Sequence, residues 1–195
     1  MTNTSGFIRD ALEGVDKLFS ERWSPRAFTA KHTIEKRTLA KIIDAARWSP
    51  SCFNEQPWVF YTSSDSTFDD YLALLVESNQ QWAKNASVIG FLAGKKQFSR
   101  NGKPNDYSRF DCGAAWMGLT LQSRIEGLYT HGMGGFDRAA AEQYLHMDTG
   151  SEEVIMAFAI GKIGNKNTLP ETLRGLEQPS GRKALDEIWV SKEVR

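Results

Sequence analysis

After its first residue, the heptapeptide Ser87-Val88-Ile89-Gly90-Phe91-Leu92-Ala93 contains only apolar side chains and one glycine. A β-strand formed by this segment would therefore be apolar on both faces. Strands of that kind are buried on both sides, in the interior of a sheet. We predict that residues 87–93 form a strand in the middle of a sheet.

Helical and strand-like patterns alternate on either side of this segment, which favours an α/β or α+β fold. Further strands are predicted over residues 58–62, 129–131 and 154–160, and helices over residues 34–46, 72–79, 110–126 and 139–145. One more helix is predicted at the start of the chain, where apolar residues recur at helical spacing. These residues are Ile8, Leu12, Val15, Leu18 and Phe19.

Length and composition indicate a single domain. The chain has 195 residues, of which 41% are hydrophobic and 25% charged, which is enough to bury one sizeable core. The 24 basic and 24 acidic side chains cancel, so no global field favours nucleic acid or an anionic membrane. No apolar run approaches the roughly 20 residues of a membrane span, and no secretory leader is recognisable. We expect a cytoplasmic protein that binds neither nucleic acid nor membrane.

The sequence offers little support for thiol or metal chemistry. Cys52 and Cys112 stand in unrelated contexts and lack a histidine partner at a recognisable spacing, so we expect reduced, unreactive thiols. The three histidines are scattered, without the paired spacing of a metal site. We therefore expect no metal.

Two basic clusters suggest an anionic ligand. Arg22, Ser24 and Arg26 place two guanidinium groups and a hydroxyl within five residues, and Pro25 fixes the backbone between them. Arginine matches phosphate oxygens with paired N–H donors. A further basic pair, Arg182-Lys183, lies near the C-terminus. Surface arginines are common, and each could be a solvated charge, but together they predict a phosphorylated cofactor.

Two loops could supply polar groups to a flat ligand. Ser51, Asn54 and Gln56 carry hydroxyl and amide groups between a helix and a strand. These groups suit the edge of a heteroaromatic ring, and equally they could satisfy their own loop backbone. Residues 132–135 include three glycines, which could form a tight turn or offer backbone N–H groups at close range.

Five motifs follow one another along the chain. They are Arg22-Trp23-Ser24-Pro25-Arg26-Ala27-Phe28, Ala45-Ala46-Arg47-Trp48-Ser49-Pro50-Ser51 continuing through Asn54-Glu55-Gln56-Pro57-Trp58, Asn79 ahead of Ala86-Ser87, Gly134-Gly135-Phe136-Asp137, and Arg182-Lys183. None of the motifs is diagnostic alone, but five in this order and spacing are specific. Their order, over almost the whole chain, resembles the nitroreductase family, the FMN-dependent NAD(P)H oxidoreductases. This chain has Gly134 where many members carry an acidic residue, so one carboxylate contact of those members is absent.

The resemblance implies one nitroreductase-like domain over residues 1–195, an α+β sandwich in which helices flank a central mixed β-sheet. It also implies an intertwined homodimer with C-terminal strand exchange. An arm of residues 168–195 would reach the partner subunit and bury the apolar residues 188–190 there. The helix at 110–126 would lie in the dimer core, and residues 95–109 could form a partial lid.

The resemblance further implies two FMN molecules at the subunit interface. Residues 22–26, with Arg182, would hold the phosphate, the ribityl chain and the pyrimidine edge, and residues 50–56 would come from the other subunit. Asn79 would reach the polar edge of the isoalloxazine ring, and the Gly134 N–H would donate to flavin N5. The complete set of expected cofactor-binding residues is Arg22, Trp23, Ser24, Arg26, Pro50, Ser51, Cys52, Asn54, Gln56, Asn79, Met133, Gly134, Gly135, Arg182 and Lys183.

The implied reaction passes hydride from NADH or NADPH through flavin N5 to a nitroaromatic, a quinone or a related conjugated acceptor, in a ping-pong cycle without a catalytic side chain. Two other classes stay open. One is a flavin-binding protein that does not turn over NAD(P)H. The other is a binding module for a phosphorylated metabolite that uses the same arginines without flavin. The sequence does not choose between NADH and NADPH.

Overall fold

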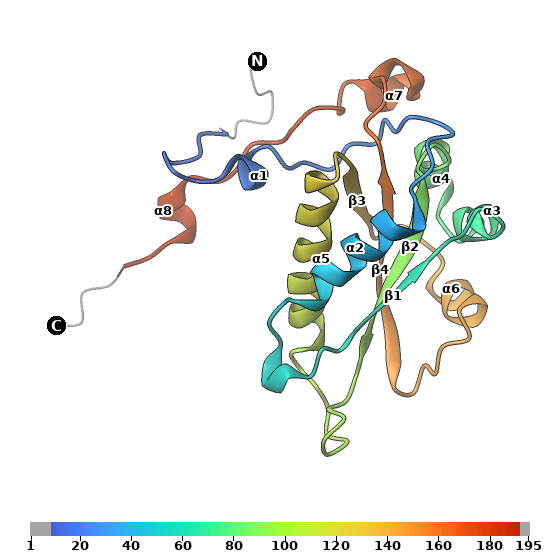
Figure 1. Ribbon diagram of the computed structural model, residues 1–195, viewed down its shortest axis with the longest axis vertical. Helices are drawn as coiled ribbons and strands as arrows, with labels where there is room; N and C mark the ends of the chain where they lie inside the picture. The colour runs from blue at the N-terminus through green and yellow to red at the C-terminus, as the bar shows by residue number, and fades with distance from the viewer. Residues whose placement is uncertain (1–8, 192–195) are drawn as a thin grey trace.

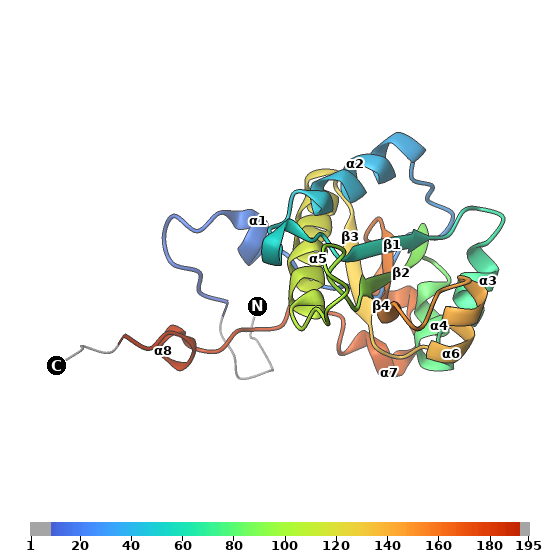
Figure 2. The same ribbon diagram turned by 90° about the horizontal axis from the view of Figure 1, so that it is seen from below.

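A four-stranded sheet lies between two layers of helices (Figures 1 and 2). The computed structural model describes residues 9–191. All three strand pairings within these residues are antiparallel, so the prediction of a mixed sheet is wrong for the described part of one chain. Each strand runs opposite to its neighbours. A parallel pair would need a strand from outside the described residues, such as one from a partner chain. The strands, in the order β1-β2-β4-β3, are β1 (Trp58–Thr62), β2 (Val88–Lys95), β4 (Glu152–Gly161) and β3 (Tyr129–Met133).

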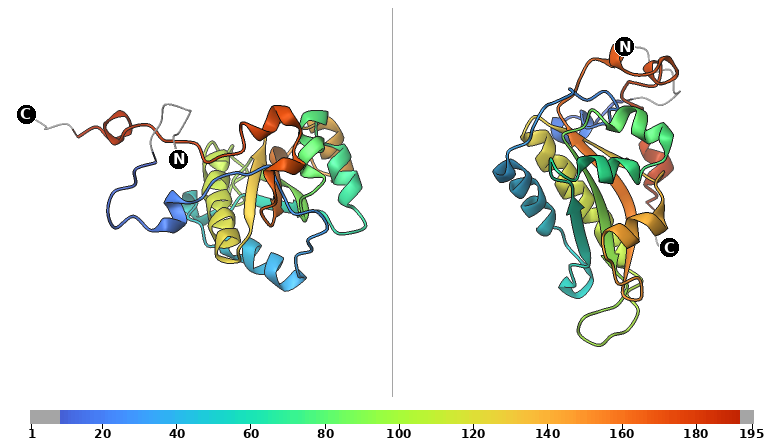
Figure 3. Two further views of the ribbon diagram at one scale, coloured as in Figure 1. Left: turned by 90° about the horizontal axis from the view of Figure 1, so that it is seen from above. Right: turned by 90° about the vertical axis from the view of Figure 1, so that its right-hand side faces the viewer.

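The helices divide between the two faces of the sheet, as the expected α+β sandwich requires (Figures 2 and 3). One face carries α2 (Lys36–Arg47) and α5 (Ser108–Ile125). The other face carries α3 (Phe68–Ala73), α4 (Glu77–Ala83) and α6 (Arg138–Tyr144). The remaining short elements are α1 (Lys17–Ser20), η1 (Cys52–Asn54), η2 (Lys166–Thr168), α7 (Glu171–Arg174) and α8 (Leu185–Ile188).

The inner strand β2 confirms the predicted central strand, since it is buried along residues 88–94. Ile89 and Phe91 belong to the core on the side of α3, α4 and α6. Val88 and Leu92 belong to the core on the side of α2 and α5. Side chains alternate across a strand, so one apolar strand serves both cores.

The helix predicted over residues 110–126 is present as α5, and it packs closely against α2. A Cβ added to Gly118 would lie 3.1 Å from Ala45 O, so the glycine lets the two backbones approach. Gly127 follows the helix in the left-handed region, with φ 75°. The outer side of α5 is not covered, because Phe110 is 78% exposed and Ile125 63% exposed.

The first predicted helix is wrong, because within residues 9–22 only the four residues of α1 are helical. Gly14 adopts φ 89°, outside the helical region. Leu12, Val15 and Phe19 are exposed, so no core formed by the described residues covers these helically spaced side chains. A helix of about a dozen residues is marginal in water without such packing. Ile8 lies outside the described residues.

Two other segments differ in detail from the predictions. The helix expected over residues 72–79 is split into α3 and α4, because Leu75 leaves the helix to pair with the segment after β3. Residues 95–109, where the resemblance implied a possible partial lid, turn back on themselves through a bridge between Gln97 and Pro104.

Both ends of the described chain leave the body of the domain (Figure 1). We call residues 9–22 the N-terminal arm and residues 176–191 the C-terminal arm. Ile188, Trp189 and Val190 are 68%, 67% and 70% exposed, so no other residue of the described chain buries them. No strand lies within the described residues of the predicted exchanging arm, and residues 192–195 are outside them. Strand exchange with a partner stays a prediction.

Candidate active site

A cavity of about 530 Å³ opens where the N-terminal arm meets α5 and the β3–β4 edge of the sheet. Its floor comes from the folded body, and its polar wall comes from Arg22 at the end of the arm and from Ser24 just after it. Four of the predicted residues are brought together there, including Arg22 and Gly134, which lie far apart in sequence. The lining residues are Arg22, Ser24, Trp116, Met117, Thr120, Gly132, Met133, Gly134 and Met156.

Three guanidinium groups gather beside this cavity, and we call Arg9, Arg22 and Arg182 the arginine group. Burial lowers the pKa of Arg22 below its ordinary value, and the nearby charges of Arg182 and Arg9 lower it further. Burial and Arg182 also lower the pKa of Arg9. Within residues 9–191, no ion pair joins any of the three to a carboxylate. Uncompensated positive charge of this kind fits a phosphate dianion.

Arg26 makes its contact with Glu177 through its backbone N–H, and its side chain does not line the cavity. The N–H groups of Arg26 and Ala27 donate to the Glu177 carboxylate, at 2.9 and 2.8 Å from Oε1. Glu177 therefore fastens the start of the C-terminal arm to the arginine motif, close to Arg22 and Arg182.

His131, on β3, contacts the backbone of the arginine motif at Pro25. Burial lowers the pKa of His131 to about 4, so the ring is neutral near pH 7. Its Nδ1 lies 2.9 Å from Pro25 O, to which it donates in the tautomer that carries the proton on Nδ1. The ring also packs on Trp82, with 4.6 Å between centroids. A half-buried, neutral imidazole thus fixes the backbone between Ser24 and Arg26.

The glycine loop after β3 is held by Asn79. Its Nδ2 donates to Gly135 O at 2.9 Å. A Cβ on Gly135 would lie 2.8 Å from Val76 Cγ2 and 2.9 Å from Asn79 Nδ2, whereas a Cβ on Gly134 would meet no atom within 4 Å. Gly135 is therefore required by packing, and Gly134 faces open space at the cavity. Asn79 was predicted at a flavin edge; in this chain its amide nitrogen positions the loop.

The polar loop at residues 50–56 does not line the cavity of its own chain. Ser51 Oγ accepts from the Gln56 N–H at 2.9 Å, and Gln56 Nε2 donates to Asn54 O at 3.1 Å. The Cys52 N–H donates to Oδ2 of the buried Asp111 at 3.1 Å. The loop therefore satisfies part of its own backbone, as one of the two interpretations proposed.

The backbone of this loop is nonetheless unusual. Phe53, Asn54 and Gln56 all adopt left-handed φ values, of 54°, 58° and 52°. Such conformations cost free energy in residues other than glycine, and they concentrate at functional sites. Pro50 and Asn54 are exposed, so this loop is available to another chain.

Two further predicted residues lie at the margin of the site. Trp23 packs edge-to-face on Tyr129, with ring centroids 6.3 Å apart. Lys183 is exposed next to Arg182.

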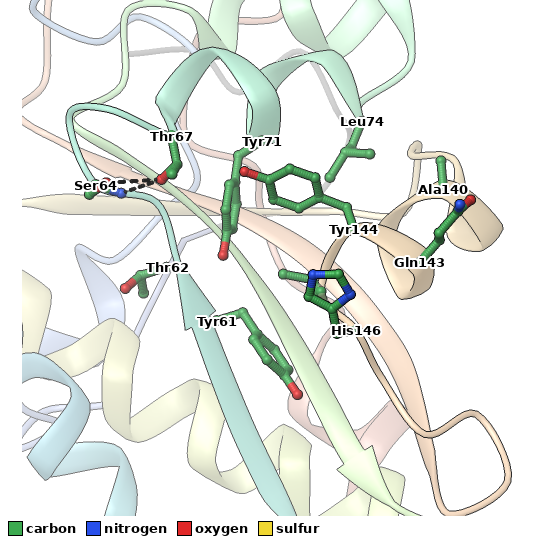
Figure 4. Close-up of a pocket in the computed structure, with 11 residues that line it drawn as sticks. Tyr61, Thr62, Ser64, Thr67, Tyr71, Leu74, Ala140, Gln143, Tyr144 and His146 are labelled. Carbon is green, nitrogen blue, oxygen red and sulfur yellow. Dashed lines mark hydrogen bonds between the residues drawn. The ribbon is translucent and has the colours of Figure 1, made fainter.

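A larger hollow, of about 910 Å³, lies between β1, α3 and α6, on the sheet face opposite to α5 (Figure 4). Tyr61, Tyr71 and Tyr144 line it, and Tyr144 Oη donates to Asp70 Oδ2 at 2.9 Å. No predicted site residue lines this hollow, and its lining residues include neither lysine nor arginine. It lacks the positive charge that a phosphate would need.

Sequence reasoning missed several residues of the cavity. Trp116 and Thr120 are one turn apart on α5, so the helical spacing could have placed them on one face. Met156 stands on β4, where no sequence signal separates a cavity residue from a core residue. Arg9 gave no signal, because its segment was predicted to be part of a helix. Glu177 acts through a contact across about 150 residues of chain.

Other chemistries find no site in the described part of the chain. No cluster of histidine, cysteine or acidic residues there could hold a metal ion. Burial raises the pKa of Cys112 to about 12, so its thiol is protonated. No helix among residues 9–191 is long and apolar enough to cross a membrane.

Fold and site together define an α+β domain with a cavity that lies beside an arginine group and a glycine loop. The chain belongs to the nitroreductase family, whose family model matches residues 19–78 and 67–162. A solved structure described as an oxidoreductase containing FMN is similar, with a TM-score of 0.89 and 36% identity over 100% of this chain and 99% of that one.

Two curated relatives extend this comparison. A protein of Archaeoglobus fulgidus, named provisionally as an NADH dehydrogenase/NAD(P)H nitroreductase, is 28% identical over 155 residues, which is 78% of this chain and 86% of that protein. An oxygen-insensitive NADPH nitroreductase of Helicobacter pylori is 32% identical over 73 residues. The latter match spans 37% of this chain and only 35% of the Helicobacter protein.

Proposed function

We propose that the protein is a flavin oxidoreductase that holds FMN in the cavity beside the arginine group and takes electrons from NADH or NADPH. The observation that carries the proposal is the arginine group, which gathers positive charge without a carboxylate partner among the described residues. The phosphate of FMN is a dianion that would neutralise this charge. The relative described as containing FMN is similar over the whole chain, which supports the same cofactor here.

The residues in and beside this cavity suit different parts of the flavin. Arg22 and Arg182, with Lys183 nearby, would bind the phosphate, and Ser24 would donate to the ribityl chain or to the phosphate. The Gly134 N–H would face the isoalloxazine ring, because no atom stands within 4 Å of a Cβ built there. Trp23 and Arg26 would act near the pyrimidine edge, Trp23 through its backbone.

A second copy of the chain would complete the site. The loop at residues 50–56 is remote from the cavity of its own chain and carries left-handed backbone at three residues. In a homodimer it would supply Pro50, Ser51, Cys52, Asn54 and Gln56 to the partner's flavin. The exposed side of α5 and the exposed apolar residues of both arms support such a dimer, since surfaces of this kind mark interfaces.

The cavity walls suit a reaction that the cofactor carries. Bound FMN would supply hydride chemistry, between NAD(P)H and a nitroaromatic, quinone or related conjugated acceptor, in a ping-pong cycle. The cavity-lining residues include no carboxylate, histidine, lysine or cysteine, so side-chain acid–base catalysis has no candidate among them. Trp116, Met117 and Met156 would exclude water, and the backbone N–H of Gly134 would orient the ring.

The test is to add NADH or NADPH without oxygen to the purified, FMN-loaded protein and to record its visible spectrum. We expect a flavin spectrum that bleaches with one or both donors and recovers when a quinone or nitroaromatic is added. Flavin that stays oxidised would indicate a flavin-binding protein without NAD(P)H turnover. A protein that takes up no FMN would contradict the proposal and favour a binding module for another phosphorylated metabolite.

A further inference from the structure

Arg9 joins three parts of the chain that are distant in sequence. Its Nη2 donates to Ser20 O and, at 3.1 Å, to Arg22 O. Its Nη1 donates to Ser180 O at 3.2 Å, across 171 residues. One guanidinium group therefore links the start of the N-terminal arm to the arginine motif and to the C-terminal arm.

These bonds oppose a repulsion. Arg22 and Arg182 carry like charges, and the charge of Arg182 adds to burial in lowering the pKa of Arg22. Glu177 fastens the start of the C-terminal arm to the arginine motif, but Ser180 and Arg182 lie beyond this contact. Without the Arg9 bonds, this further part of the arm would move away from Arg22 to relieve the repulsion, since it is largely exposed. Arg9 adds a third positive charge. Its N–H groups, however, donate to backbone carbonyls of both arms, and these hydrogen bonds hold the arms in place.

An arginine is required for this geometry. The guanidinium group presents five N–H donors in a rigid planar fork, and it can donate in several directions at once. A lysine ammonium has the same charge, but it is a compact group on a flexible stem. It could not reach carbonyls on both arms in the same arrangement.

We propose that Arg9 is a positioning residue for the cofactor phosphate, because it ties the two arms together so that Arg22 and Arg182 converge on one anion. The inference rests on the proposed function, and it adds a residue that lies outside the five motifs that carry the family resemblance. Arg9 would act through the arms and not by contact with the reacting ring.

The test compares two flavins that differ only in the phosphate. Dissociation constants for FMN and for riboflavin are measured by fluorescence quenching for the wild-type protein, Arg9→Ala, Arg9→Lys and the control Arg37→Ala, whose side chain is exposed on α2. We expect Arg9→Ala to weaken FMN about tenfold, the size of one or two lost hydrogen bonds. Riboflavin affinity should not change, and Arg37→Ala should match the wild-type protein for both flavins.

Arg9→Lys separates the tether from the charge. We expect it to behave like Arg9→Ala, because the charge remains while the links to both arms are lost. In the free protein, hydrogen exchange in peptides that cover residues 18–22 and 178–182 should be faster in both Arg9 variants than in Arg37→Ala. Full FMN affinity in Arg9→Lys, or unchanged exchange in these peptides, would overturn the positioning role.

Failure of the inference can be told apart from failure of the proposed function. If wild-type protein binds FMN no more tightly than riboflavin, the phosphate site itself is refuted, and the role of Arg9 falls with it. If the wild-type protein prefers FMN but Arg9→Ala keeps that preference, or loses affinity for both flavins equally, only the role of Arg9 is refuted.

Discussion

The sheet with its helices and the two arms are held together by different forces. Phe158 on β4 and Leu119 on α5 are both fully buried, so apolar burial stabilises the body. The arms expose Phe19 and Trp189, and they are fastened by polar contacts, such as those of Glu177 with the arginine motif. The candidate site combines the two regions, since its floor lies in the body and its charges lie on the arms. Cofactor binding should therefore depend on the arms, and folding on the body.

The largest expected effect is on the charges of the arms. Replacing both Arg22 and Arg182 with Ala removes charge-assisted hydrogen bonds worth about 1.5–3 kcal/mol each, so FMN affinity should fall by about 1,000-fold. Arg26→Ala should cost less than about tenfold, because its side chain does not line the cavity. Isothermal titration with FMN measures both changes.

The expected difference between the two variants is absent if Arg26→Ala lowers the affinity for FMN as much as the double variant does. That result would place the Arg26 side chain on the phosphate, as the sequence alone predicted. A double variant that unfolds on heating at a lower temperature than the wild-type apoprotein would show that the arginines also stabilise the body.

The second prediction contrasts one residue of the body with one of an arm. Leu119→Ala should lower the free energy of unfolding by about 4 kcal/mol, because it leaves a cavity in a closed core. Trp189→Ala should leave the folded chain as stable as before, and should act only through dimer formation, which depends on protein concentration. Urea unfolding at several protein concentrations measures both effects. A concentration-independent loss in Trp189→Ala would mean that the arm packs on its own body.

The third prediction concerns pH and the histidine beneath the arginine motif. The pKa of His131 is about 4 in the folded chain, against an ordinary value of 6.5. The unfolded chain therefore binds more protons between these values, and stability falls as the pH is lowered from 6.5 to 4. The loss should approach about 3 kcal/mol, and it should level off below pH 4.

His131→Asn is the matched variant, since its amide can still donate to Pro25 O but does not titrate. The slope of unfolding free energy against pH should become flatter between pH 6.5 and 4 in this variant. An unchanged slope would show that His131 is not the titrating group.

The smallest expected effect concerns two adjacent glycines where the body meets the cavity. Gly135→Ala should destabilise the fold by about 1–2 kcal/mol, because its Cβ would collide with Val76 and Asn79. Gly134→Ala should melt at the wild-type temperature and change only flavin binding, since its Cβ meets no atom in this chain. Thermal unfolding of the two apoproteins measures the difference. Equal destabilisation by both would refute the assignment of Gly134 to the open side of the loop.

The same contrast explains what the sequence could predict. The strand at residues 58–62 and the helix near 110–126 are confirmed, because burial imposes a periodic pattern on the segments that form the body. Apolar residues of the N-terminal arm have the same periodicity, yet only α1 is helical there. A pattern shows that a face is apolar, but it does not show whether another surface covers that face.

The sequence predicted the motif residues of the site, but not the residues that hold those motifs in place. The motif residues Arg22, Ser24 and Gly134 meet in one cavity, as their order in the family resemblance suggested. Arg9 and Glu177 act through backbone contacts across the chain, which no local pattern encodes. The loop at 50–56 lies outside the cavity of its own chain, so its expected role depends on a second copy.

The central claim is that FMN binds on the charges of the arms and over the floor of the body, in a site that a second chain completes. Sedimentation velocity of the FMN-loaded protein, followed at the flavin absorption band, tests it most directly. We predict that flavin sediments with a species of twice the chain mass of 21.9 kDa, at one FMN per chain. Flavin that sediments tightly bound to a monomer, or a dimer that carries none, would contradict the account.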